Sequence, residues 1–187
     1  MASGPLTFAA TMTSADKWIQ AGYSCFAKAG LQGLKVEAMA RQAGISKSSF
    51  YHHFADVELF TERLMQYHLQ QVSVLAAKER QVRCIDPELI DVLLQHADDL
   101  LFSRQLRFAQ QHPLLAHTLQ RSNELVGTDF IRIWKADMRL QLTDIQLLAL
   151  FTLAIENFFL QLHPGRFNRL WLQQYFSHLK QLAAAFT

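Results

Sequence analysis

The chain has 187 residues, a formal net charge of +2, and only two cysteines, Cys25 and Cys84. So small a net charge excludes a histone-like protein with a uniformly basic surface, and two cysteines do not form a disulfide framework. Half of the residues are hydrophobic, whereas Gly (7) and Pro (4) are scarce. Leu, Ala and Gln dominate and alternating strand-like runs are absent, so the composition predicts an all-α protein with a substantial core.

The two segments that could direct the chain to a membrane do not have the expected composition. Residues 1–12 lack the positive start and long apolar stretch of a signal peptide, and we expect a flexible tail there. The most apolar segment, residues 145–162, contains Gln146, Glu156, Asn157 and Gln161, which makes it too polar for a membrane span. The sequence therefore predicts no membrane association and a cytoplasmic location.

The N-terminal region predicts a three-helix head. Thr13 and Asp16 have the spacing of a capping box, and the helix that they open should end at Gly30. Two short helices follow in LKVEAMARQAGISKSSFYHHFADVELF, residues 34–60. Gly44 suits the left-handed turn between them, and Ser46 suits the N-cap of the second. This pattern predicts a helix-turn-helix in residues 13–55, whose second helix enters the DNA major groove.

The remaining residues, 56–187, predict a larger helical body, giving about nine helices in all. Start and stop signals place helices at 56–80, 86–101, 113–139, 143–163 and 168–186. The last two are apolar over more than one face, so a second cover is needed. The alternatives are simple burial in the core of the body and, as we expect, the same helix pair of another subunit. The residues predicted for this dimer interface are Phe151, Ile155, Phe158, Phe159, Leu172, Tyr175, Phe176 and Leu179.

From Ala43 the sequence reads AGISKSSFYHHF, which resembles the pattern AGVSKGTLYxHF of the TetR family of bacterial transcriptional regulators. The likeness extends from about Ala15 to Leu64, while the body is similar to the family only in being helical. The resemblance implies a homodimeric repressor that binds a near-palindromic double-stranded operator and is released by a small apolar or aromatic effector. It implies no cofactor and no catalytic activity.

The resemblance also implies which residues contact DNA. Lys47 can reach phosphate or a guanine edge, and short hydroxyls beside it can bond to bases or phosphates. Three positions depart from the family pattern: Lys35 replaces a capping Thr, Ser48 a common Gly, and Val57 a phosphate-binding Lys. The predicted DNA-binding residues are Lys35, Val36, Ser46, Lys47, Ser48, Ser49, Tyr51 and His52.

An effector pocket is expected among aromatic residues of the body that have a few polar neighbours. The candidates are Phe102, Gln105, Phe108, His112, Phe130, Trp134, Phe151 and Glu156. Aromatic residues at helical spacing are more often core, and Glu156 could equally bond across the dimer. No metal-ligand spacing, phosphate-binding loop or nucleophile motif is present. The alternative function is an all-α protein-interaction module that has lost DNA binding.

Overall fold

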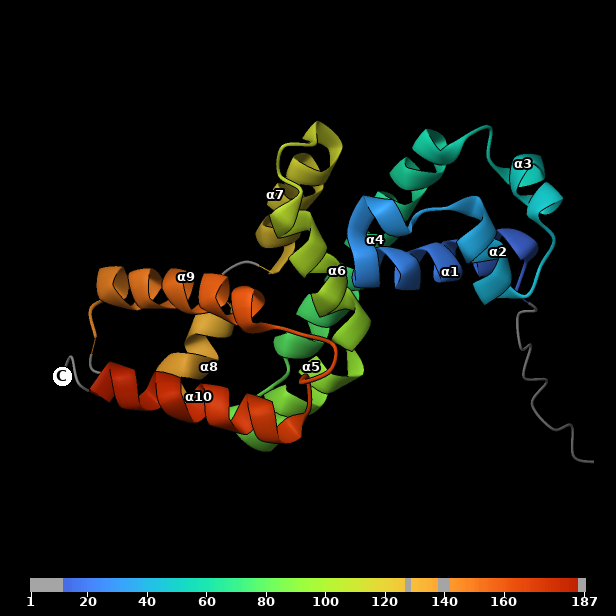
Figure 1. The fold of residues 1–187 in the computed structure, drawn as a ribbon. Helices are drawn as coiled ribbons and strands as arrows, with labels where there is room; N and C mark the ends of the chain where they lie inside the picture. The colour runs from blue at the N-terminus through green and yellow to red at the C-terminus, as the bar shows by residue number, and fades with distance from the viewer. Residues whose placement is uncertain (1–11, 127–128, 138–141, 185–187) are drawn as a thin grey trace, which may run out of the picture.

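The computed structural model describes residues 12–126, 129–137 and 142–184. Every regular element in these ranges is helical, which confirms the all-α prediction. Ten α-helices are found where about nine were predicted. The head and the α9–α10 pair lie at opposite ends of the molecule, and α4 to α6 connect them (Figure 1). The predicted tail falls almost entirely outside the described residues.

The head consists of α1 (Ser14–Ala29), α2 (Val36–Ala43) and the short α3 (Phe50–His53). The capping box of α1 is present: the Asp16 N–H donates to Thr13 Oγ1 over 3.2 Å, and the Thr13 N–H donates to Asp16 Oδ2 over 3.0 Å. Gly44 ends α2 at φ 67° and ψ 31°. This left-handed conformation carries little cost for Gly, and it confirms the predicted turn.

The core of the head is aromatic and fully enclosed. Trp18, Phe26, Met39 and Phe50 have no exposed surface, and the edge of one ring of the Trp18–Phe50 pair meets the face of the other at 5.1 Å between centroids. Phe50 of α3 therefore points into the head core. Leu31, an apolar residue of the head, is 38% exposed and lies on the 3₁₀ turn Gly30–Gly33 between α1 and α2.

The helix α4 (Val57–Glu79) begins in the head and continues into the body. Asp56 caps it as predicted, since its Oδ1 accepts the Leu59 N–H at 2.7 Å. Near its start, α4 approaches α1 closely at Gly22. A Cβ atom at Gly22 would lie 2.4 Å from Cζ of Phe60, whose side chain is fully buried. The two helices thus pack directly against each other, with no side chain of α1 between them at this point.

The middle of the chain is more broken than its sequence predicted. The helix expected over 86–101 is a π turn at Ile85–Leu89, followed by α5 (Ile90–Gln95) and α6 (Ala97–Phe108). Asp86 is extended, at φ −116° and ψ 122°, and does not lie in a regular helix. The single helix expected over 113–139 is α7 (Pro113–Val126) and α8 (Asp129–Asp137), and Arg139 lies outside the described residues.

The last two helices are α9 (Asp144–Gln161) and α10 (Arg169–Ala184), which lie side by side (Figure 1). Thr143 and Gln146 form the capping box of α9. Among the described helices, α9 alone is long and apolar enough to cross a membrane, although core and interface helices of proteins outside membranes also meet this criterion. The segment predicted to be too polar for a span therefore does meet the criterion of length and composition.

The residues predicted for the dimer interface lie mostly inside the chain. Phe151 and Ile155 are half-buried, and the other six are at most 8% exposed. The exposed apolar side chains of these helices are others: Ile145, Leu148, Leu153 and Leu160 of α9, with Leu170 and Leu182 of α10. When a helix is apolar on all sides, its sequence does not show which side packs against the rest of its own chain. The predicted residues are those that pack inside this chain, and the exposed apolar side chains lie on the other side.

Candidate nucleic-acid interface and body cavity

The helix-turn-helix presents a polar surface centred on residues 46–52. Lys47 lies on a 3₁₀ turn (Lys47–Ser49) that leads directly into α3. Tyr51 is 58% exposed, and Lys35 and His52 are exposed as well. The cationic group of Lys47, the phenol of Tyr51 and the imidazole of His52 therefore lie on the outside of the element that would enter a major groove.

The three serines of this surface are not equivalent. The hydroxyls of Ser46 and Ser48 lie 3.2 Å apart and are exposed. The Ser49 hydroxyl instead donates to the Ser46 carbonyl at 2.8 Å and accepts Trp18 Nε1–H at 3.1 Å. Ser49 therefore holds the turn on the head core rather than facing outward. Ser46 has the extended backbone of an N-cap, but its side chain does not make the expected capping hydrogen bond.

One predicted contact residue, Val36, and one departure from the family pattern, Val57, have side chains that are at least partly buried. The side chain of Val36 is 5% exposed, so it belongs to the head core and leaves only its main chain for DNA. Val57 is half-buried at the first position of α4. Lys35 begins α2 without a side-chain cap, as expected from the replacement of Thr by Lys.

Lys47 has an acidic partner on the preceding helix. Its Nζ forms a salt bridge with Oε1 of Glu37, and both side chains are more than half exposed. The hydrogen bond to Lys47 lowers the pKa of Glu37, and the same bond raises the pKa of Lys47. The pair keeps the ammonium group on the surface of the head, where a phosphate would compete with the carboxylate for it.

A cavity of about 270 Å³ lies in the body between α4, α6, α7 and α9. Its wall contains three of the predicted pocket residues: Trp134, Phe151 and Glu156. Leu75, Leu100, Phe158, Phe159 and Phe176 contribute further apolar surface. This is larger than the roughly 150 Å³ cavity that accommodates benzene in an engineered protein, and it has the apolar lining typical of small-molecule sites.

The other predicted pocket residues lie elsewhere. Phe102 is buried and stacks on Phe26 of the head at 4.1 Å between centroids. Gln105 Nε2 donates to the Ala27 carbonyl at 3.3 Å, again at the junction with the head. Phe108 and His112 are exposed, and the side chain of Phe130 lies outside the described residues. Phe102, Gln105, Phe108 and His112 do not line the cavity.

Two charged residues that the sequence analysis did not select lie in the wall of the cavity. Glu79, the last residue of α4, is 6% exposed, and burial raises the pKa of its carboxyl to about 7. Arg107 of α6 lies over the Phe159 ring at 3.8 Å, and Nε is 3.7 Å from Oε1 of Glu156. Both charges fall on otherwise apolar helix faces, with Leu75 one turn before Glu79, and this pattern could have identified them.

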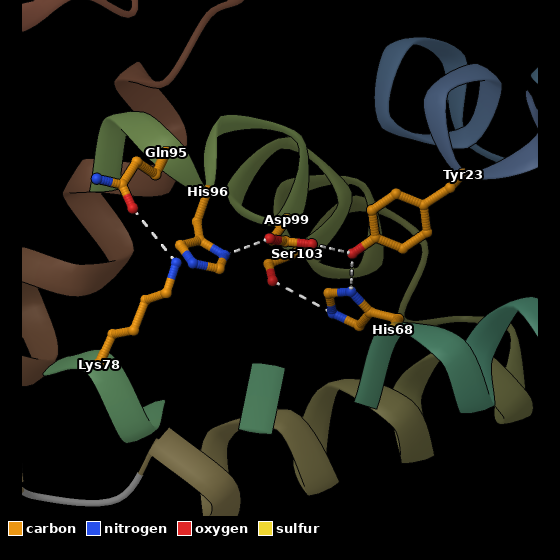
Figure 2. A network of polar contacts seen from close by, with 7 residues as sticks. All are labelled: Tyr23, His68, Lys78, Gln95, His96, Asp99 and Ser103. Atoms are coloured by element: carbon orange, nitrogen blue, oxygen red, sulfur yellow. Dashed lines mark hydrogen bonds and ion pairs between the residues drawn. The ribbon is translucent and has the colours of Figure 1, made fainter. Parts of the chain in front are cut away.

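A buried polar network joins the head to the body beside this cavity (Figure 2). The Tyr23 hydroxyl of α1 donates to Oδ1 of Asp99 at 2.6 Å and lies 2.8 Å from Nδ1 of His68. His96 Nδ1 lies 2.7 Å from the other carboxylate oxygen of Asp99. Ser103 Oγ lies 3.4 Å from His68 Nε2. Residues of α1, α4 and α6 thus meet in one network.

The donor and the acceptor of the hydrogen bonds between Tyr23, Asp99, His68 and Ser103 can be assigned. Burial lowers the pKa of His68 to about 3, so its imidazole is neutral near pH 7 and carries one N–H. Because the phenol proton of Tyr23 goes to Asp99, His68 Nδ1–H donates to the Tyr23 oxygen. His68 Nε2 then accepts from Ser103, whose side chain also lines the cavity. Ser103 and His68 therefore form a hydrogen-bonded connection from the wall of the cavity to Tyr23 of the head.

Comparison with known proteins agrees with this architecture. Residues 19–61, which include α2, α3 and the start of α4, match the family model of bacterial regulatory proteins of the tetR family. No curated protein matches the chain.

Three solved structures share the fold. A transcriptional regulator from Rhodococcus sp. Rha1 is 14% identical, with a TM-score of 0.61 over 91% of this chain and 96% of that one. A protein assigned to the TetR family from Mesorhizobium loti MAFF303099 is 16% identical, with a TM-score of 0.54 over 92% and 95% of the two chains. Another from Rhodococcus sp. is 18% identical, with a TM-score of 0.52 over 91% and 96%.

The family match covers the helix-turn-helix, and the shared fold covers nearly the whole chain. The protein therefore carries the DNA-binding head of the TetR family of bacterial transcriptional regulators on a helical body of the same architecture.

Proposed function

We propose that this protein is a homodimeric, cytoplasmic repressor that leaves its operator when a small molecule occupies the body cavity. Residues 13–55 would bind DNA, and residues 56–187 would bind the effector and dimerise. The observation that carries the proposal is the exposed Lys47, Tyr51 and His52 group on a helix-turn-helix of the tetR family. Two such heads would read successive major grooves, roughly 34–36 Å apart, on a near-palindromic site.

The exposed apolar face of α9 and α10 supports a dimer. Leu153 is 70% exposed, Leu160 is 65% exposed and Ile145 is 83% exposed, on a helix that would otherwise be a core element. Several large apolar side chains exposed on two neighbouring helices favour an interface. A second copy related by a two-fold axis would cover it with the same face.

The contact between the cavity and the buried network supports release by an effector. Ser103 lines the cavity and contacts His68, which contacts Tyr23 of α1. A ligand that moves α6 or α4 would therefore alter the position of the head. The ligand only needs to favour the non-binding arrangement by about 1–3 kcal/mol or more.

The DNA-binding part is tested by selecting bound sequences from genomic fragments and measuring their affinity against salt concentration. Lys47→Ala should weaken binding and reduce the salt slope by about one charge. Tyr51→Phe should weaken binding while leaving the salt slope nearly unchanged. Lys180→Ala on α10 removes the same charge far from the head and serves as the control. Equal affinities and slopes for Lys47→Ala, Tyr51→Phe and the parent protein would mean that this surface does not bind DNA.

The dimer is tested separately by sedimentation of Leu153→Glu, with Leu31→Glu in the head as a matched exposed-leucine control. We expect the first variant to be monomeric and the second to remain dimeric. A parent protein that sediments as a monomer at micromolar concentration would contradict the proposed assembly.

A further inference from the structure

The wall of the cavity contains one buried acidic side chain, that of Glu79. Glu79 is 6% exposed, and no hydrogen bond or ion pair to its carboxylate is found within residues 12–126, 129–137 and 142–184. An ionised carboxylate has about four lone-pair positions to satisfy, and leaving a buried one unpaired is costly. A carboxyl group retained at such a position, in the wall of a cavity, indicates that its partner comes from a ligand.

The basic side chains near Glu79 are engaged elsewhere. Arg107 donates to the Asn123 side chain at 3.2 Å and to the Ser103 carbonyl at 3.4 Å, lies over Phe159, and faces Glu156 at 3.7 Å. Arg80 is exposed, and its guanidinium donates to the Leu125 carbonyl at 3.5 Å. The positive charge of Arg107 is therefore opposed by Glu156. The nearby charge of Arg80 favours the ionised form of Glu79 and lowers its pKa, but burial raises that pKa by more, and no bond joins the two side chains in the described residues.

The rest of the lining suits a cation attached to an apolar body. Trp134, Phe151, Phe158 and Tyr175 present aromatic rings to the cavity, and such rings attract a cation through their negative faces. The Trp134 and Phe151 rings meet edge to face, 5.5 Å apart between centroids. A volume of about 270 Å³ accommodates a molecule larger than benzene.

We propose that the ligand of this cavity is a monovalent organic cation, an aromatic or aliphatic body with one protonated amine that bonds to the Glu79 carboxylate. This inference rests on the proposed function only in treating the cavity as the effector site. An anionic ligand would instead meet the unpaired Glu79 and would have to displace Glu156 from Arg107. A neutral ligand would add no charge for Glu79 to pair with and would leave the carboxyl as it is without a ligand.

Three probes of one shape test the ligand class: 2-naphthylmethylamine, 2-naphthylmethanol and 2-naphthoate. Calorimetric titration at pH 7.5 should give the amine an affinity at least tenfold higher than either of the others. Glu79→Gln keeps the side-chain shape and should reduce amine affinity at least tenfold, while changing alcohol affinity less than threefold. Glu124→Gln, an exposed carboxylate of α7, removes the same charge outside the cavity and should leave all three affinities unchanged.

The proposal is wrong if the alcohol or the carboxylate binds as tightly as the amine, if Glu79→Gln retains amine affinity, or if none of the probes binds. Operator binding is then measured with and without saturating amine. An amine that binds through Glu79 without weakening operator binding would support the ligand class and contradict effector-gated release. Release by the amine in the parent protein but not in Glu79→Gln would support both.

Discussion

The Tyr23 hydroxyl of the head donates a 2.6 Å hydrogen bond to the Asp99 carboxylate of the body, in a site closed to solvent. Residues 76 positions apart in the chain are thereby joined at the boundary between the DNA-binding helices and the cavity. Burial and the neighbouring Asp99 charge raise the pKa of Tyr23, so the phenol remains a hydrogen-bond donor at all physiological pH values.

Tyr23→Phe should lower the free energy of unfolding by about 1–3 kcal/mol, because Asp99 loses a donor and His68 loses an acceptor in a buried site. Urea denaturation at pH 7 measures the change. Tyr67→Phe is the matched control, since the Tyr67 hydroxyl makes none of the hydrogen bonds found in the described structure. We expect that control to change stability by less than about 0.5 kcal/mol. Equal effects of the two variants would contradict a structural role for the network.

Gly22→Ala should destabilise the protein by roughly 1–3 kcal/mol, because its Cβ would lie 2.4 Å from Cζ and 2.7 Å from Cε1 of the fully buried Phe60. Thermal unfolding measures this effect. Gly165→Ala has its closest contact at an ordinary 3.5 Å and should be nearly neutral. A Gly22→Ala protein as stable as the parent would show that α1 and α4 can separate without cost.

Glu37→Gln should strengthen operator binding several-fold at low salt, because it frees the Lys47 ammonium group and removes a negative charge from the DNA-facing surface. Fluorescence anisotropy with labelled operator, titrated at several salt concentrations, measures the change. The gain should shrink as salt rises. Glu124→Gln in the body should bind as the parent does. Weaker binding by Glu37→Gln would instead indicate that the pair orients Lys47 for contact.

Burial raises the pKa of Glu79 from 4.5 to about 7, so the folded protein holds a proton that the unfolded chain releases between these values. This contribution is fully present below pH 4.5 and is lost as the pH rises through about 7. The stability of the parent relative to Glu79→Gln should therefore fall by about 3 kcal/mol between pH 4.5 and 7.5. Denaturation curves of both proteins across this range measure their free energies of unfolding. A difference between the two proteins that does not change with pH would mean that the Glu79 carboxyl is in contact with solvent.

The pKa of His68 shifts in the opposite sense, from 6.5 to about 3, because its imidazole is buried. The unfolded chain binds a proton below pH 6.5 while the folded protein does not, so stability is complete above pH 6.5 and is lost as the pH falls towards 3. In the Glu79→Gln background, the slope between pH 6 and pH 5 should be about 1.4 kcal/mol per pH unit. Adding His68→Asn should remove most of that slope, and an unchanged slope would assign it to other groups.

The parts of the fold that the sequence predicted are those that local signals determine. Thr13, Gly44 and Asp56 act on residues within one helical turn, and the structure places all three as predicted. The 113–139 segment was predicted as one helix because both halves carry the same apolar spacing, which does not reveal that α7 and α8 are separate helices. Such a break depends on packing between distant helices.

The site could be predicted only in part for the same reason. Lys47, Tyr51 and His52 lie within one short motif, and their exposure follows from the helix-turn-helix itself. The partners Tyr23 and Asp99 are far apart in sequence, so their hydrogen bond depends on the packing of α1 on α6. Phe102 and Gln105 were assigned to a pocket because their residue types suit one, whereas that packing places them against the head.

Gly22 and Tyr23 are adjacent in the chain, and they attach α1 to two different helices: Gly22 by close packing on Phe60 of α4, Tyr23 by its hydrogen bond to Asp99 of α6. These two attachments oppose rotation of the head relative to the body. In a dimer, the distance between the two recognition helices would be fixed by how the bodies cross. Mutations at the subunit interface would then change the spacing between the two half-sites that such a dimer recognises. The residues of the recognition helices would stay the same.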